Sequence, residues 1–398
     1  MIMPNLRMLE NALPVAPLKI VAMDSAAKLG KSVNNYLVEF RKRTNTAYKS
    51  DPAFQGYCEP NYLLDAAAPR FGTGEAKGIF NESVRGKDLF ILVDVCNNSI
   101  TYNMNGYINR KSPDDHYQDL KRIISAATGK ARRINVIMPY LYEGRQHKRN
   151  TRESLDCAYA LEELASMGVE NFITFDAHDP RVQNATPLYG FDNFSAYYQF
   201  LKTLLESVDD MIIDKDHTVV ISPDEGALDR AVYFAGVLGV DAGLFYKRRD
   251  YSTIVNGKNP IVAHEFLGDN LDGKDVIIID DIISSGESIL DTAGQIKAMN
   301  AKRIFILATF GQFNNGLDAF DKAYERCVFD KIITTNLIYT RPELKQKPYY
   351  LEADVSKFIA QIIDFMNHDI SVSNVTTSTE KIHEVLKRYN DRQNFELN

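Results

Sequence analysis

The chain has 398 residues, which is enough for two domains of ordinary size. Hydrophobic residues make up 45% and charged residues 25%, as in globular proteins, and no apolar run is long enough to predict a membrane span. The net charge of −7 argues against a nucleic-acid-binding protein, because such domains carry a surplus of basic residues.

The amino-terminal stretch and the cysteines indicate the compartment. Residues 1–18 contain Glu10 and three prolines and have no unbroken apolar core, so they make a poor signal peptide. The cysteines at positions 58, 96, 157 and 327 are widely spaced and form no CxxC pair, which is typical of free thiols in a reducing compartment. We therefore expect a cytoplasmic protein.

Buried apolar runs alternate with amphipathic segments along the chain, which predicts an α/β fold with parallel sheets. In the first half we expect strands at 18–23, 88–93, 133–139 and 171–175, and helices ending near residue 42 and over 114–127 and 154–167. In the second half we expect strands at 217–222, 242–246, 276–279, 303–309 and 331–335, and helices at 196–208, 289–297 and 351–367.

The remaining stretches are polar. Residues 43–70 and 96–113 are expected to be irregular insertions, and 180–195 a bridge to the second half. The stretch 251–272 contains Asn-Gly and Gly-Asp turns and is typical of a mobile lid loop. A polar helix over 380–389 is expected in the tail.

The stretch 276–288 carries the strongest functional signal. A buried strand leads to Asp280 and Asp281, and a turn with three serines and Gly286 then opens a helix. Such a turn directs backbone N–H groups and the positive end of the helix dipole at one point, where a phosphate fits. The two carboxylates suit sugar hydroxyls or a cation instead. The alternative is an ordinary strand-to-helix turn with solvated acids.

Two segments concentrate basic side chains. Three cations and His147 lie within residues 145–149, which indicates an anionic ligand in an acidic protein. Lys247 and Arg249 are two positions apart on a chain that reads as extended, so they share one face. Such a pair can neutralise charge that develops on a transferring phosphoryl group. A solvated basic turn is the alternative in both places.

Three further turns place polar groups next to strands or glycines. Residues 70–75 form a tight loop around two glycines. His178, between acids at the end of a predicted strand, could ligate a divalent ion, although a lone histidine is more often structural. Asp224 lies in a Pro-Asp-x-Gly sequence, which would also suit a plain turn.

The stretch around Asp280 resembles the ribose-phosphate binding signature of the phosphoribosyltransferase fold. Its surroundings, over about residues 17 to 375, resemble the ribose-phosphate pyrophosphokinase family. The matching motifs are Phe71–Glu75 followed by Glu82–Gly86, Arg145-Gln146, His178, Ser222-Pro223-Asp224, and Lys247 with Arg249. The chain departs from the family pattern at Thr73, His147, Ser284 and Glu287, where the family commonly has Asp or Asn, Asp, Asp and Gly.

The resemblance implies a role for each matching residue. It implies that ATP is bound by Phe71, Thr73, Gly74, Glu75, Arg145, Gln146 and His147. It implies that ribose 5-phosphate is bound by Asp280, Asp281, Ser284, Ser285, Gly286, Glu287 and Ser288. Lys247 and Arg249 would be catalytic, and His178 and Asp224 would bind Mg²⁺ as the cofactor.

The resemblance also implies a fold and an activity. The fold would be two phosphoribosyltransferase-type domains, each a mostly parallel sheet flanked by helices, over residues 17–190 (with 345–375 returning to it) and 191–344, with a tail at 376–398. The chain would be a transferase of nucleotide biosynthesis, a ribose-phosphate diphosphokinase that makes phosphoribosyl pyrophosphate and AMP. A homo-oligomer, dimer or hexamer, would be expected, with no nucleic-acid or membrane partner. A phosphoribosyltransferase and a non-catalytic regulatory relative are the alternatives.

Overall fold

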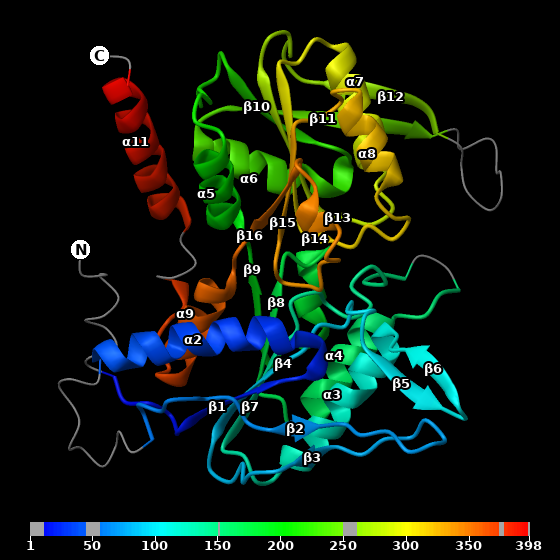
Figure 1. Cartoon of the computed structure of the whole chain (residues 1–398), viewed down its shortest axis with the longest axis vertical. Coiled ribbons are helices and arrows are strands. Elements are labelled where there is room, and N and C mark those ends of the chain that lie inside the picture. The colour runs from blue at the N-terminus through cyan, green and yellow to red at the C-terminus, as the bar shows by residue number, and fades with distance from the viewer. Residues whose placement is uncertain (1–11, 45–55, 150–151, 250–260, 374–377, 397–398) are drawn as a thin grey trace. The chain divides into compact units, whose positions relative to one another are not determined.

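The computed structural model describes residues 12–44, 56–149, 152–249, 261–373 and 378–396 (Figure 1). The chain forms two compact units, Met1–Ser195 with Asn336–Tyr339 and Asp354–Thr377, and Ala196–Thr335 with Thr340–Ala353 and Ser378–Asn398. Each unit is a mostly parallel sheet flanked by helices, which confirms the predicted fold class. Within the described ranges, no helix combines the length and the hydropathy needed to cross a membrane.

The first unit is built on a parallel sheet with the strand order β1-β4-β7-β8-β9. Its strands are β1 (Leu18–Ala22), β4 (Asp88–Leu92), β7 (Arg133–Ile137), β8 (Asn171–Phe175) and β9 (Gly190–Phe194). The first four lie where the sequence predicts strands. The fifth lies inside the stretch predicted to be a bridge, and that prediction was wrong: β9 has no β-branched residue, and its strand conformation comes from pairing with β8.

Helices cover this sheet. The helices α3 (Pro113–Ala127) and α4 (Asp156–Ser166) bury their apolar sides in one core with the sheet. Ser112 caps α3, and Pro113 follows it, as its sequence predicts. The helices α2 (Ala27–Thr44) and α9 (Ser356–Asn367) lie side by side (Figure 1). Arg41 of α2 donates to Asp364 (2.9 Å) and Asn367 (2.6 Å) of α9, so the returning segment is tied to the first unit by a buried ion pair.

The second unit has the strand order β12-β11-β10-β13-β14-β15-β16, with β12 antiparallel to β11 and the other neighbours parallel. The strands are β10 (Thr218–Ser222), β11 (Asp241–Arg249), β12 (Ile261–Leu267), β13 (Asp275–Ile283), β14 (Arg303–Gly311), β15 (Lys331–Thr335) and β16 (Tyr350–Ala353). The helices around it are α5 (Tyr197–Ser207), α6 (Leu228–Leu238), α7 (Glu287–Ala298), α8 (Asp318–Glu325) and α11 (Ser378–Glu396) (Figure 1).

Two predictions for the second half need correction. The stretch predicted as a lid contains β12, because residues 261–267 pair with the edge of β11, while residues 250–260 lie outside the described ranges. The helix predicted over 351–367 begins only at Ser356, because residues 350–353 form a strand paired with β15. Asp354 then accepts a hydrogen bond from the Ser356 N–H (2.9 Å) between the two elements.

The tail forms the predicted polar helix, which extends beyond its predicted ends and packs on α5 and α6. Ile382 and Tyr389 of α11 are buried. The Tyr389 hydroxyl donates to the carbonyl of Val208 (2.6 Å) and accepts from the N–H of Met211 (2.9 Å). The tail is therefore part of the second unit rather than a separate appendage.

The insertion predicted at 96–113 is not irregular. It contains an antiparallel hairpin of β5 (Thr101–Met104) and β6 (Tyr107–Arg110), which is separate from the main sheet. The two-residue turn has Asn105 at φ 51° and Gly106 at φ 84°. Asn-Gly between two strands is a strong local hairpin signal, because both residues tolerate positive φ, so this element was predictable from sequence. A smaller pair, β2 (Ala66–Ala67) and β3 (Ile79–Phe80), lies before it in the chain.

Asp94 follows β4 and is a buried carboxyl group, only 2% exposed. Its oxygens accept hydrogen bonds from the N–H groups of Cys96 (2.8 Å) and Tyr339 (2.6 Å). Burial raises the pKa of Asp94 from its ordinary value of 3.8 to about 7, although the two N–H donors oppose the shift.

Asp94→Asn is expected to change how stability depends on pH. Because the pKa of Asp94 is higher in the folded chain, the folded state binds more protons between pH 4 and 7, and its stability falls as the pH rises through that window. The free energy of unfolding of the original chain should fall by up to roughly 4 kcal/mol relative to the variant across this range. Urea unfolding at several pH values measures this, with the exposed Asp65→Asn as control. Parallel profiles for the original chain and Asp94→Asn would contradict the prediction.

Candidate active site

Three neighbouring strands of the second unit bring five predicted site residues to one edge of the sheet. The strands β11, β10 and β13 are adjacent and parallel, so their carboxyl ends lie on the same side. Asp224 follows β10 after one residue. Lys247 and Arg249 are among the last three residues of β11, and Asp280 and Asp281 lie near the carboxyl end of β13. Polar groups at this edge of a parallel sheet are where ligands of open α/β folds bind.

The carboxylates of Asp224, Asp280 and Asp281 lie close enough at this edge to repel one another. The pKa of Asp280 is raised well above its ordinary value, first by burial and then by the neighbouring charges of Asp281 and Asp224. Asp281 is buried, and Nη2 of Arg230 lies 3.7 Å from its Oδ2. A cluster of carboxylates that repel one another favours a cation or hydroxyl donors as its ligand.

Asp280 and Asp281 were predicted to lie at the carboxyl end of the strand, but they lie within β13. The strand β13 continues to Ile283, because Ile282 and Ile283 keep pairing with β14. The apolar pair after the acids extends the buried ladder, and the turn begins only at Ser284.

The turn that follows has the geometry expected of a phosphate site. Gly286 has φ 88° and begins α7, and no side chain caps this helix end. The Ser284 hydroxyl accepts a hydrogen bond from Nδ2 of Asn314 (3.1 Å), and the Ser284 carbonyl accepts one from the backbone N–H of Asn314 (2.8 Å). Ser285 Oγ accepts weakly from the Glu287 N–H (3.4 Å), and Glu287 and Ser288 are exposed in the first turn. The start of α7 thus presents backbone donors and hydroxyls together.

The basic pair lies in a strand rather than in the turn considered as the alternative. The strand β11 continues through Arg249, and its pairing with β12 shifts register between Arg248 and Arg249. The backbone of Lys247 pairs with that of His264. The side chains of residues 247–249 are outside the described part, so their role stays a prediction.

In the first unit, residues 71–75 form a tight loop closed by its own hydrogen bonds. The Phe71 N–H donates to the Glu75 carbonyl (2.7 Å), and the Gly74 N–H donates to the Phe71 carbonyl (2.9 Å). The Thr73 hydroxyl donates to the Glu75 carboxylate (3.0 Å). Phe71 is 53% exposed, so the loop presents an aromatic face on which a base can stack.

A second group forms where β7 and β8 end side by side. The rings of His147 and His178 are 5.6 Å apart, and His147 Nε2 lies 3.3 Å from Oδ2 of Asp179. Burial lowers the pKa of His147, against the attraction of Asp179. Arg181 binds the Asp179 carboxylate and lowers its pKa. Asp179 and Arg181 were not among the predicted site residues, although their place in the segment that follows β8 could have indicated them.

Arg145 and Gln146 lie in the same segment after β7. Arg145 is exposed, whereas Nε2 of Gln146 donates to the carbonyl of Ser154 (2.8 Å). Gln146 is therefore tied to Ser154, just before α4.

The donor set fits Mg²⁺ better than a closed protein-only metal site. Among the described residues, no group of three or more His, Cys, Asp or Glu side chains is arranged to hold a metal ion. Mg²⁺ usually keeps several waters and takes only one or two carboxylates besides substrate phosphates. Asp224, half-buried beside Asp280, offers one such carboxylate.

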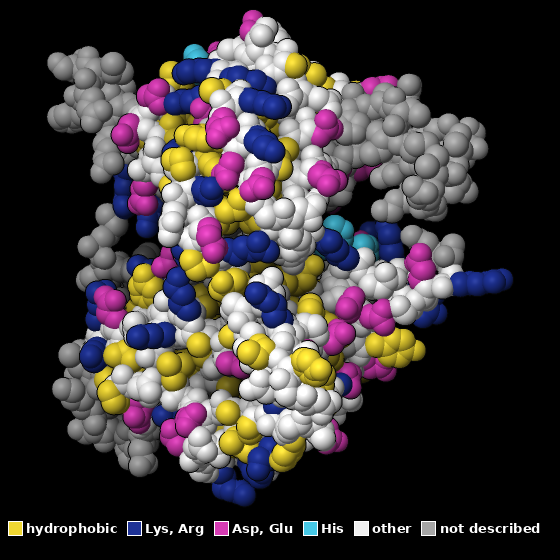
Figure 2. Space-filling view, turned by 45° about the vertical axis from the view of Figure 1, so that its right-hand side comes forward, with side chains coloured by type: hydrophobic (Ala, Val, Ile, Leu, Met, Phe, Trp, Pro, Cys, Tyr) yellow, Lys and Arg dark blue, Asp and Glu magenta, His cyan; other side chains and the backbone are white. Residues whose placement is uncertain are grey.

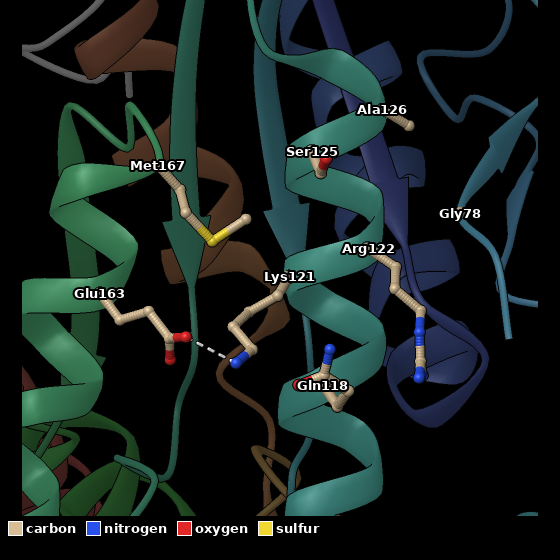
Figure 3. A pocket seen from close by; sticks show the side chains of 8 residues that line it. All are labelled: Gly78, Gln118, Lys121, Arg122, Ser125, Ala126, Glu163 and Met167. Atoms are coloured by element: carbon tan, nitrogen blue, oxygen red, sulfur yellow. Dashed lines mark hydrogen bonds and ion pairs between the residues drawn. The ribbon is translucent and has the colours of Figure 1, made fainter. Parts of the chain in front are cut away.

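A pocket of about 440 Å³ in the first unit is lined by none of the predicted residues (Figure 3). It lies between α3 and α4 and is lined by Gly78, Gln118, Lys121, Arg122, Ser125, Ala126, Glu163 and Met167. Lys121 Nζ lies 2.7 Å from Glu163 Oε1, and Arg122 is paired with Asp119 (2.6 Å). Because both cations are paired, the pocket does not offer a free anion site.

Charges of both signs are interspersed over the face of the molecule shown in Figure 2. The net charge of −7 is therefore not gathered into one acidic patch on that face.

Two family models match the chain. One, the N-terminal domain of ribose phosphate pyrophosphokinase, matches residues 18–168, and the other, the phosphoribosyl synthetase-associated domain, matches residues 251–376. The first match covers the 71–75 loop and Arg145 to His147, and the second covers the carboxylates and the turn before α7.

The chain is similar to curated proteins along most of its length. It is 28% identical over 316 residues to the ribose-phosphate pyrophosphokinase of Vibrio parahaemolyticus, covering 78% of this chain and 90% of the relative. It is 29% identical over 321 residues to that of Pasteurella multocida, covering 79% and 92%.

A solved structure has the same fold. The crystal structure of phosphoribosylpyrophosphate synthetase from Mycobacterium smegmatis matches with a TM-score of 0.68 and 21% identity, over 88% of this chain and 99% of that one. Together with the site geometry and the two family models, these similarities show that the chain belongs to the ribose-phosphate pyrophosphokinase family of enzymes.

Proposed function

We propose that the chain is a ribose-phosphate diphosphokinase. The anomeric hydroxyl of ribose 5-phosphate attacks the β-phosphorus of ATP, the bond between the β-phosphorus and the oxygen of the α-phosphate breaks, and AMP leaves. The products are phosphoribosyl pyrophosphate, AMP and the proton of the hydroxyl. The observation that carries the proposal is the strand order of the second unit. It brings the acids of β13, the basic residues of β11 and Asp224 after β10 to the same edge of the sheet.

Ribose 5-phosphate is held by the end of β13 and the start of α7. The 5-phosphate lies against residues 284–288, where backbone N–H groups and serine hydroxyls converge. Asp280 and Asp281 accept hydrogen bonds from the ribose hydroxyls. The raised pKa of Asp280 supports this role, because hydroxyl donors relieve the repulsion among these carboxylates.

ATP is held by the two segments of the first unit. Phe71 stacks on the adenine, while Thr73, Gly74 and Glu75 contact its edge and Arg145, Gln146 and His147 contact the phosphates. His178 in the first unit and Asp224 in the second would each contribute to holding Mg²⁺, which would offset charge on the phosphate oxygens. Lys247 and Arg249 stabilise the charge that develops on the transferring group.

The proposal predicts AMP release that depends on both substrates. The purified chain with ATP, Mg²⁺ and ribose 5-phosphate should release AMP in equal amount to phosphoribosyl pyrophosphate, because each transfer breaks one ATP. Leaving out ribose 5-phosphate, or removing Mg²⁺ with a chelator, should reduce the rate at least about 100-fold, because transfer rests on positioning and charge neutralisation. Chromatography of the nucleotides measures both. The absence of product from folded, Mg²⁺-supplied protein would sink the proposal.

A non-catalytic regulatory relative is the second candidate, and one observation favours it. Glu287 stands exposed in the first turn of α7, where its charge repels a phosphate at that helix end. Under this alternative the chain binds ATP or ribose 5-phosphate in titrations but forms no product. A phosphoribosyltransferase would instead consume phosphoribosyl pyrophosphate when nucleobases are supplied, which a second incubation tests.

A further inference from the structure

The β5–β6 hairpin packs directly on the loop formed by residues 71–75. The Asn105 N–H at the hairpin turn donates to the carbonyl of Gly72 (2.8 Å). A Cβ atom added to Gly74, which has φ 94°, would lie only 2.6 Å from Sδ of Met104. The backbone of the loop therefore rests against the Met104 side chain, with no room for a side chain in between.

The base of the loop is held by the same hairpin. The guanidinium of Arg70 lies 4.7 Å from the centre of the Tyr102 ring, and its Nη1 donates to the carbonyl of Gly74 (3.4 Å). Its Nη2 lies 3.0 Å from the carboxylate of Asp119 in α3. Arg70 thus connects the loop, the hairpin and the helix.

The hairpin itself is anchored at its base. Lys111 Nζ, just after β6, lies 3.1 Å from the same Asp119 carboxylate and 2.7 Å from that of Asp24. Before β5, Asn97 donates to the carbonyl of Ser25 (2.7 Å). Asp119 is fully buried, so one carboxylate holds both the base of the loop and the base of the hairpin.

We propose that the hairpin is a positioning element for the 71–75 loop, and that Met104 sets the affinity of that loop for the adenine of ATP. The inference rests on the proposed function. A loop with two glycines loses much conformational entropy when it is ordered. A hairpin that orders the loop beforehand removes that loss from the binding step, which raises affinity without any new contact to the ligand.

The hairpin provides matched positions for a test. Met104 is half-buried against the loop, whereas Tyr107, on the other side of the same turn, is 75% exposed. Met104→Ala removes the packing under Gly74, Met104→Leu keeps its volume, and Tyr107→Ala serves as the control. Thermal unfolding of each full-length variant shows that the chain remains folded.

The first measurement needs no ligand. Met104→Ala should speed amide hydrogen exchange at Phe71 and Gly74 by about tenfold, because their hydrogen bonds close the loop that has lost its support. Met104→Leu and Tyr107→Ala should exchange like the original chain. Unchanged exchange in Met104→Ala would overturn the inference by itself, whatever the protein catalyses.

The second measurement concerns the nucleotide. Met104→Ala should raise the KM for ATP about tenfold, the equivalent of roughly 1.4 kcal/mol, with kcat and the KM for ribose 5-phosphate within twofold of the original. Met104→Leu should restore the KM. Faster exchange with an unchanged KM for ATP would overturn the assigned role in ATP affinity. An original chain that neither turns over nor binds ATP in titrations would refute the proposed function instead.

Discussion

Lys247→Ala is expected to lower kcat by about 10³-fold, with little change in folding. In a phosphoryl transfer the protein does little covalent chemistry, so a cation positioned at the transferring group contributes much of the acceleration. Lys247 lies in β11, whose neighbour β10 is followed by Asp224. The strand β13, which carries Asp280, lies on the other side of β10. The substitution leaves the backbone pairing of β11 with β10 and β12 in place.

Single-turnover kinetics with saturating substrates would measure the effect, and circular dichroism would confirm that the fold persists. Arg248→Ala is the matched control, because it removes an adjacent cation from the same strand at the position between the two predicted catalytic residues. We expect its kcat to stay within a few-fold of the original chain. Equal losses in both variants would show that only the general positive charge of the segment matters, and full activity in Lys247→Ala would remove this residue from the mechanism.

Gly286→Ala is expected to disrupt the proposed ribose 5-phosphate site. The residue has φ 88°, a conformation that L side chains rarely adopt, and a Cβ atom there would lie 2.1 Å from the ring of Phe320. Phe320 is fully buried in the core of the second unit, so the ring cannot move aside without opening a cavity. Strain and overlap together should reduce the free energy of unfolding by about 2–4 kcal/mol.

The turn must rebuild to accept this methyl group, which moves the first N–H groups of α7 away from the proposed position of the phosphate. The KM for ribose 5-phosphate should therefore rise about 100-fold, while the KM for ATP changes far less. Gly294→Ala in the same helix is the control, because nothing lies within 4 Å of its added Cβ. That variant should be slightly more stable than the original chain. If Gly286→Ala binds ribose 5-phosphate normally, the start of α7 is not its phosphate site.

The elements that sequence predicted correctly are those with a strong local pattern. The buried β-branched runs of β10 and β13 and the amphipathic helices α3 and α4 belong to this group. Three of the strands it missed depend on a partner: β9 on β8, β12 on β11 and β16 on β15. The helices α6 and α8 were also missed. The β5–β6 hairpin was missed for a different reason, since its Asn-Gly turn was a readable local signal.

The sequence alone determined the chemistry available to this protein, because residue types and their spacing within a turn are local properties. The acids before a serine-rich turn, the basic pair and the exposed Phe71 loop could all be found that way. Only the tertiary structure decided which of these groups meet. The strand order brings Asp224, which follows β10, to the neighbour of the strand β13 that carries Asp280. The fold also brings Asp119 to both Arg70 and Lys111. Such meetings depend on non-local strand pairing and burial, which no local periodicity encodes.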